Sequence, residues 1–310
     1  MSVDLLCMGE PMLEFNQLPP EPDGRRLYLE GHGGDTSNAA IAAARMGARV
    51  GYLTAVGTDM PGDSFMALWT REGVDTSTVR RDPRHQTGVY FVTHDQAGHH
   101  FLHYRKDSAA AMMGPTDVPE QAVAGARILY LSGISQGISA SAGQAAVAAM
   151  AVARRHGVAI AYDTNYRPRL WPAATARDAM HAAMAHVTYA LPGIEDVATM
   201  TGLTDPQAIL DLYLGLGPRV VVLKMGAAGC WVAAEGQRVH IPPHPVTVVD
   251  ATGAGDTFCG AFLARILAGD DPIGAARFAA VAAALKCTGY GAVAPIPGPD
   301  AVRAAMRAGA

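Results

Sequence analysis

Short, almost continuous apolar segments alternate with alanine-rich segments along most of this chain. The apolar segments have the length of β-strands, and they lie at 3–8, 50–56, 128–132, 158–163, 187–191 and 220–224. Helical spacing of apolar residues marks the alanine-rich segments, which lie at 36–46, 140–156, 173–186 and 207–214. Strands that are apolar on both faces and separated by helices are typical of a parallel sheet covered by helices. The alternation therefore predicts an α/β fold with a mainly parallel central sheet.

Two β-like runs interrupt this alternation. GVYFVT at 88–93 and HHFLHY at 99–104 are joined by the turn-forming residues 94–98, which predicts a hairpin inserted into the α/β fold. With the extended segment 13–30, the hairpin would form a small β lid over the carboxyl ends of the strands, where ligands of such sheets bind. A lid there would exclude water from a reaction. The alternative is an edge hairpin without a role in the site.

Composition narrows the class of partner. The 310 residues carry a net charge of −4 and only 17% charged residues, and the arginine pairs are scattered, so neither nucleic acid nor a membrane surface is expected as a partner. The four cysteines form no CxxC pair and lie in apolar segments, which predicts free buried thiols. The N-terminal residues carry no basic or long apolar segment, so we expect a cytoplasmic protein.

The strongest chemical signal is DATGAGDTF at 250–258, which leads into an apolar helical run. Small residues let the backbone approach a phosphate, and the amides at a helix N-terminus point toward it. A carboxylate directly after such a turn would repel a phosphate, but it suits a base for an incoming hydroxyl group, so Asp256 is the candidate base. The alternative for Asp256 is an ordinary helix cap.

An early glycine motif, GHGGDTSN at 31–38, lacks the GxGxxG spacing of dinucleotide-binding folds. Together with DATGAGD it resembles the ribokinase-like carbohydrate kinases, the PfkB family, from Gly9 to Pro297. The resemblance implies one kinase domain over 1–310, a Rossmann-like three-layer sandwich with a β lid formed by about 12–32 and 86–108. It also implies ATP and Mg²⁺ as cofactors, and phosphoryl transfer to a sugar hydroxyl.

The resemblance assigns roles to individual residues. Asp256 is the implied catalytic base, with an anion hole made by the amides of Gly253, Ala254 and Gly255. The implied nucleotide contacts comprise these three residues together with Asn165, Lys224, Gly226 and Thr252. The family's Asn-x-x-Glu element appears as GIED at 193–196, so either Glu195 or Asp196 would serve magnesium. An asparagine often found near the nucleotide is absent from 278–285.

Within the family, the segments at 103–106, 129–135 and 163–171 resemble 2-keto-3-deoxygluconate kinases. This implies phosphorylation of that sugar acid at its terminal hydroxyl group. The implied substrate contacts, besides Asp256, are Gly34, Tyr90, His103, Arg105 and Arg167. Position 103 departs from the pattern, because tyrosine is expected there. Lids of this family often pair between subunits, so the resemblance also implies a homo-oligomer formed through the lid.

The positions of Arg105 and Arg167 also indicate a function independently of the resemblance. Arg105 ends a lid strand and Arg167 follows the strand at 158–163, so both would overhang one cleft. Paired guanidinium groups suit a carboxylate, whereas a neutral hexose would leave them little to bind. The alternative is that they form ordinary surface ion pairs. No further ligands accompany the hairpin histidines at 99, 100 and 103, so no metal site is predicted on the hairpin.

Two other functions stay open from the sequence. One is a ribokinase-like kinase of another sugar, such as fructose or a related ketose or sugar acid. The other is a non-catalytic sugar-binding regulator on the same fold, although a sensor needs the pocket and not the base that Asp256 supplies.

Overall fold

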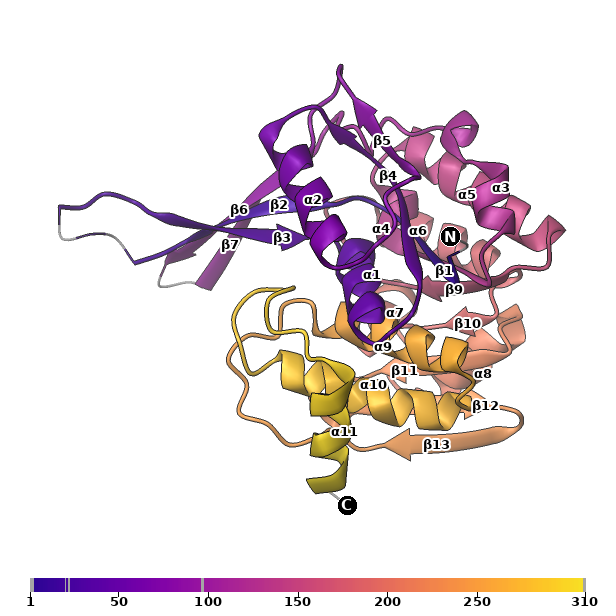
Figure 1. Ribbon diagram of the computed structural model, residues 1–310. Helices are drawn as coiled ribbons and strands as arrows, with labels where there is room; N and C mark the ends of the chain where they lie inside the picture. The colour runs from indigo at the N-terminus through magenta and orange to yellow at the C-terminus, as the bar shows by residue number, and fades with distance from the viewer. Residues whose placement is uncertain (1–2, 20, 22, 96–97, 309–310) are drawn as a thin grey trace.

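The computed structural model describes residues 3–19, 21, 23–95 and 98–308. Within these residues the chain forms a nine-stranded sheet between two helical layers and a four-stranded sheet that projects from it (Figure 1). In sheet order the large sheet contains β13 (Gln237–Ile241), β12 (Cys230–Ala234), β11 (Val220–Lys224), β10 (Tyr189–Ala190), β9 (Ala159–Asp163), β8 (Ile128–Ser132), β1 (Leu5–Met8), β4 (Val50–Gly57) and β5 (Val79–Asp82). From β11 to β5 all pairs are parallel, and β12 and β13 add antiparallel strands at one edge.

Alternate side chains of each strand enter two separate cores. Leu5 and Cys7 of β1 face one core, and Leu6 and Met8 face the other. The first core is covered by α1 (Asp35–Arg45), α2 (Met60–Arg71), α9 (Ala254–Ala268), α10 (Pro272–Lys286) and α11 (Pro299–Ala308). The second is covered by α3 (Glu120–Ala124), α5 (Ala140–Arg155), α6 (Ala173–Met184), α7 (Ile194–Thr201) and α8 (Pro206–Leu216). The prediction of a three-layer α/β sandwich is confirmed.

Strands with fewer apolar residues escaped prediction. The apolar runs correspond to β1, β4 and β8–β11, but β5 (VRRD) and β13 (QRVHI) carry polar residues because they lie at the two sheet edges. Short helical turns follow two of the strands: α4 (Gly133–Gly137) follows β8, and the 3₁₀ turn η2 (Gly226–Ala228) follows β11. A further 3₁₀ turn, η1 (Pro115–Asp117), precedes α3.

The smaller sheet contains β3 (Tyr28–Gly33), β2 (Met12–Gln17), β6 (Gly88–Asp95) and β7 (Gly98–Tyr104), in that order. We call these four strands the lid. Its two outer pairs are antiparallel, and β2 pairs with β6 in parallel. The predicted hairpin is β6–β7, although the turn residues 96–97 lie outside the described residues. Figure 1 shows the lid extending well beyond the sandwich.

Two sequence expectations can be compared directly with the described part of the chain. All four cysteines are free and buried, which confirms the prediction of unpaired thiols. In this part of the chain, no helix combines the length and apolar character that a membrane span requires.

Candidate active site

Asp256 lies in the first turn of α9, directly above a tight glycine turn. Gly253 precedes the helix with a left-handed backbone (φ 76°), which favours glycine, and it packs against Ala292. Asn38 in the first turn of α1 donates from Nδ2 to Asp256 Oδ2 at 2.8 Å. Helices α1 and α9 approach closely at Gly260 of α9. Any larger residue there would place its Cβ on the Ala39 carbonyl of α1. The position of the carboxylate is therefore fixed by helix packing.

The surroundings of Asp256 raise the pKa of its carboxyl group. Burial, followed by the nearby Asp35 carboxylate, raises the pKa of Asp256 to about 7, although the Asn38 hydrogen bond acts in the opposite direction. A base with a pKa near neutrality is suited to general base catalysis. The helix-cap alternative is not supported, because the N-cap residue of α9 is Gly253 and Asp256 comes three residues later.

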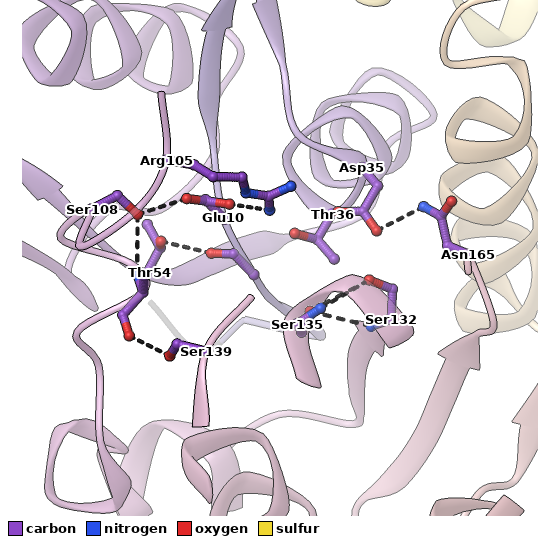
Figure 2. Close-up of polar contacts among 12 residues, drawn as sticks. Glu10, Asp35, Thr36, Thr54, Arg105, Ser108, Ser132, Ser135, Ser139 and Asn165 are labelled. Carbon is purple, nitrogen blue, oxygen red and sulfur yellow. Dashed lines mark hydrogen bonds and ion pairs between the residues drawn. The ribbon is translucent and has the colours of Figure 1, made fainter. Parts of the chain in front are cut away.

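A second carboxylate lies beside this pair. Asn165, held at φ 32°, donates from Nδ2 to Asp35 Oδ2 at 2.8 Å (Figure 2). Among the described residues, Asp35 Oδ1 and Asn38 Oδ1 are buried and have no hydrogen-bond partner. Buried acceptors without partners are uncommon, so these two atoms are available for hydroxyl groups of a bound molecule. The side-chain amide of Asn165, which was predicted to contact nucleotide, is thus bonded to Asp35.

Lys224 ends β11, and Asp163 ends β9. Lys224 Nζ donates to Asp163 Oδ2 at 2.5 Å and to Cys259 Sγ at 3.4 Å. Burial by itself would lower the pKa of Lys224, but Asp163, Cys259 and Asp196 together outweigh it, so the pKa is raised and the ammonium stays charged. A methyl group built on Gly255 would lie 3.8 Å from this ammonium. The predicted phosphate-binding lysine therefore lies beside the predicted anion hole.

Glu195 and Asp196, the acidic residues that follow β10, differ in exposure and in hydrogen bonding. Glu195 is exposed, whereas Asp196 is partly buried and accepts from Thr164 Oγ1 at 3.0 Å. Burial and then the charge of Asp163 raise the pKa of Asp196. Two neighbouring carboxylates would suit a cation, so Asp196 is the member of this pair that could serve Mg²⁺.

Only some of the backbone amides around the turn before α9 are free to bind a phosphate. The amides of Gly255 and Asp256 lie in the first helical turn, where no intrahelical carbonyl is available to them. The Ala254 amide, in contrast, donates to the Ala251 carbonyl at 3.1 Å, so it already has a partner. Thr252 is exposed and donates from its amide to Asp250 Oδ1 at 2.9 Å. Gly226, with φ 54°, opens the turn after β11.

Arg105 is engaged within the protein. Its Nη2 donates to Glu10 Oε2, and Ser108 Oγ donates to Glu10 Oε1 at 2.6 Å (Figure 2). The Glu10 side chain is fully buried, and Arg105 keeps 17% of its side chain exposed. Arg105 Nε is buried and has no partner among the described residues. The lid arginine is thus held by an internal carboxylate while one N–H group remains available.

The chain that carries Glu10 is fixed at its backbone. β1 ends at Met8, whose carbonyl accepts from Ser135 Oγ at 2.9 Å, and the Gly9 carbonyl accepts from Thr54 Oγ1 at 2.7 Å. Gly34, predicted to contact substrate, lies against the Glu10 backbone, where a Cβ would overlap the carbonyl oxygen. The glycine motif and the buried glutamate therefore support one another.

Tyr90 and His103 lie side by side on the lid. They are cross-strand neighbours whose rings stack with centroids 5.6 Å apart. The Tyr90 hydroxyl donates to Glu14 of the adjacent strand. His103 is exposed; partial burial, followed by the charge of Arg105, lowers its pKa and favours the neutral ring. The lid therefore presents one buried and one exposed polar ring.

Arg167 and Arg169 follow β9 and are both exposed. Arg167 Nη1 donates to the Tyr166 carbonyl at 3.0 Å, and no carboxylate partner is found for it among the described residues. Arg169 Nη1 donates to the Phe101 carbonyl of β7 at 2.7 Å, which joins the sandwich to the lid. The charges of Arg105, Arg169 and Arg167 all act on His103, so these cations gather at one place.

Several functional candidates carried no recognisable signal in the sequence analysis. Glu10, Glu14, Asp35, Asn38 and Asp163 owe their importance to partners far away in the chain. Only their position next to strand ends or in the glycine motif hinted at a role. Across the described residues, no cluster of side chains with metal-ligand geometry was found.

Phosphoryl transfer to a hydroxyl group needs a base for the hydroxyl and positive groups for the phosphate. Here Asp256 lies in the first turn of α9, and Lys224 at the carboxyl end of β11 approaches Gly255 of the same turn. That arrangement, under a lid, defines the class of kinases that phosphorylate small hydroxylated molecules. The chain belongs to a family within this class, because residues 4–299 match the pfkB family carbohydrate kinases. The resemblance seen in the sequence is confirmed.

Similar proteins extend over the whole chain. A 2-dehydro-3-deoxygluconokinase of Thermoproteus tenax is 33% identical over 99% of this chain and 95% of its own length. The crystal structure of a PfkB protein from Polaromonas sp. JS666 is 30% identical, with a TM-score of 0.87 over 98% of this chain and 99% of that one. An Escherichia coli protein assigned as a ribokinase II, in complex with ATP and Mg²⁺, shares the fold at 23% identity, with a TM-score of 0.91 and 99% coverage of both chains.

Proposed function

We propose that this carbohydrate kinase transfers the terminal phosphoryl group of ATP to 2-keto-3-deoxygluconate (2-dehydro-3-deoxygluconate). The single observation that carries the proposal is the Asp256 carboxylate, which is oriented by Asn38 and has a pKa of about 7 at the start of α9. The choice of sugar is supported by the full-length similarity to the kinase named for this compound in Thermoproteus tenax. The product is the 6-phosphate.

In this proposal, each part of the cleft has one task. Asp256 accepts the proton of the terminal hydroxyl group as the oxygen attacks phosphorus. The unpaired oxygens of Asp35 and Asn38 accept hydrogen bonds from sugar hydroxyls. The phosphates are held by Lys224 and by the turn that comprises Gly253, Ala254 and Gly255, with further nucleotide contacts from Asn165, Gly226 and Thr252. Bound Mg²⁺ supplies charge that neutralises phosphate oxygens, and Asp196 helps to hold it.

The sugar's carboxylate end is held under the lid. Arg167 is exposed and has no carboxylate partner in the described chain, so it forms the main ion pair. Arg105 contributes its free Nε–H group while Glu10 keeps the guanidinium plane in place. Gly34, Tyr90 and His103 line the same side of the site.

One observation favours a second candidate. Of the two arginines expected to hold a carboxylate, Arg105 is already neutralised by Glu10, and a neutral ketose such as fructose needs neither charge. An ATP-consumption screen that compares sugar acids with neutral sugars separates the two. We expect kcat/KM for 2-keto-3-deoxygluconate to exceed that for fructose by about 10- to 100-fold, the scale of a lost charged hydrogen bond. A preference for the neutral ketose would contradict the proposal.

We further propose that residues 1–310 act as one domain, that it works in the cytoplasm and that two copies pair through their lids. The lid segments at about 12–32 and 86–108 carry exposed apolar side chains at Leu29 (56%), Leu102 (54%) and Tyr104 (55%), which support burial against a second lid. Light scattering of the purified protein tests the pairing, because a monomer at micromolar concentration would exclude it.

A further inference from the structure

A fully buried lysine lies behind the glycine turn of the active site. Lys286 is the last residue of α10 and has no exposed surface. Its Nζ donates to the backbone carbonyl of Asp250 at 2.8 Å. A buried ammonium is costly unless its charge is used, and no role described so far employs it.

The lysine joins two chain segments. Residues 249–253 lead into the glycine turn, and residues 286–292 leave α10. The amides of Val249 and Asp250 donate to the Cys287 carbonyl at 2.8 and 3.1 Å, and Gly291 N donates to Asp250 Oδ2 at 2.8 Å. With the Lys286 bond, Asp250 is held through its amide, its carbonyl and its carboxylate.

Asp250 in turn determines where the turn begins. Its Oδ1 accepts from Thr252 N at 2.9 Å and from Thr252 Oγ1 at 2.7 Å. Gly253 follows at once with its left-handed backbone against Ala292. The carbonyl that Lys286 contacts therefore lies three residues before Gly253 and five before Gly255, whose amide is in the first turn of α9.

A helix C-terminus often carries a lysine that bonds its own last carbonyls. Here the last carbonyls of α10 accept from the Cys287 amide and from the Cys287 thiol, whose Sγ lies 3.2 Å from the Ala283 carbonyl. Lys286 instead reaches the other segment. Burial lowers the pKa of Lys286, while the carboxylates of Asp250, Asp256 and Glu14 act to raise it.

We propose that Lys286 is a positioning residue for phosphoryl transfer: its buried amino group donates to the Asp250 carbonyl and thereby aims the amides of the Gly253–Gly255 turn. It touches neither sugar nor nucleotide. This rests on the proposed kinase activity, and it adds the residue that keeps the anion hole in its working geometry. A misplacement of about 1 Å at a reacting centre costs about 100-fold in rate.

The first test replaces Lys286 by methionine, which keeps the length and removes the charge. We expect kcat to fall by about 10- to 100-fold while the sugar KM and the nucleotide Kd change by less than about threefold. Arg277→Met is the matched control, because Arg277 is exposed on the same helix. A wild-type kcat in folded Lys286→Met protein would overturn the proposal.

The second test separates charge from packing. Lys286→Ala leaves a hole that n-propylammonium can enter, and its neutral counterpart n-propanol serves as the control. We expect propylammonium to raise kcat of this variant saturably and to leave the wild type unchanged. Equal rescue by propanol would overturn the proposal in favour of a packing role.

A third measurement needs no sugar and so stays informative if the proposed substrate is wrong. Amide hydrogen exchange at 250–256 should be faster in Lys286→Met than in the wild type, with the exchange of α5 unchanged. If the wild type phosphorylates a different sugar, the kinetic tests are run with that sugar. Unchanged exchange at 250–256 would overturn the proposal whichever sugar is accepted.

Discussion

The lid and the nine-stranded sheet are built from strands of similar length but differ in what holds them. Every residue of β1 and β8 is buried, whereas the first three residues of β3 are exposed. In the described lid, the buried apolar cluster consists of Met12, Tyr90 and Val92. The large sheet has an extensive core on each face. The lid therefore depends on strand pairing and on whatever covers it.

The sandwich and the lid also differ in what holds their polar side chains. In the sandwich, Asp256, Asp163 and Lys224 meet at the start of α9 and are fixed by helix packing. In the lid, Tyr90 and Arg105 are held by Glu14 and Glu10. We therefore expect the sandwich to carry the groups for phosphoryl transfer and the lid to share sugar binding with Arg167. Substitutions at Asp256 should thus act on kcat, and substitutions in the lid mainly on the sugar.

Asp256→Asn should have the largest effect. Loss of the positioned base should lower kcat by about 10²–10⁴-fold, while nucleotide binding persists. Because the folded pKa of about 7 lies above the ordinary 3.8, ionised Asp256 lowers the stability of the fold once the pH rises past this window. At pH 8 the variant should therefore melt above the wild type. Near-normal turnover would return Asp256 to a structural role.

Substitutions of Arg105 in the lid and Arg167 in the sandwich test how the two regions share the binding of the sugar. Arg105→Ala and Arg167→Ala should each weaken the sugar acid by about 2–5 kcal/mol in kcat/KM, and a neutral ketose should be indifferent. Only Arg105→Ala should also lower the free energy of unfolding, by about 3–5 kcal/mol, because it leaves Glu10 buried and unpaired.

Steady-state kinetics and denaturant titrations measure both quantities. Equal losses for acid and neutral sugars would mean that the arginines act on the lid or on the phosphates.

Lys224→Met should raise the KM for ATP by about 10- to 100-fold, the scale of a hydrogen bond to a charged group, and change the sugar KM much less. Its present partner, Asp163, would lose its cation, so a second variant, Lys224→Arg, keeps the charge. A rise in the sugar KM with unchanged ATP binding would reassign this lysine.

The pH dependence of kcat/KM should show a smaller effect, with opposite directions in two variants. Asp256 acts as the carboxylate, so kcat/KM should fall as the pH drops through about 7. Asp35→Asn removes a charge that raises the pKa of Asp256, and the acid limb should move to lower pH. Asn38→Leu removes a bond that lowers this pKa, and the limb should move to higher pH. A limb that stays in place in both variants would show that another group titrates.

The smallest kinetic effect belongs to the outer surface of the lid. Leu102→Asp should separate paired lids, halving the molar mass seen by light scattering, and change kcat by less than about twofold. Thr199→Asp on α7 is exposed and serves as the control for added charge. An unchanged mass would mean that copies meet elsewhere or not at all.

The sequence by itself determined the layers of the fold and pointed to Asp256 as the candidate base. Continuous apolar runs such as 128–132 have to be buried on both faces, and GAGD at 253–256 places a carboxylate after a turn that only small residues can form. Local composition carries this information because strand burial and turn geometry are local requirements.

Only the tertiary structure decided which charges meet. Arg105 was expected to await a substrate and is held by Glu10, 95 residues away in the chain, and Asn165 meets Asp35 across 130 residues. Glu195 and Asp196 look equivalent in sequence, yet the direction of the first turn of α7 leaves one exposed and brings the other to Thr164. Partners of this kind are set by the packing of helices and strands, because a side chain's charge acts over a few ångströms of space whatever its distance along the chain.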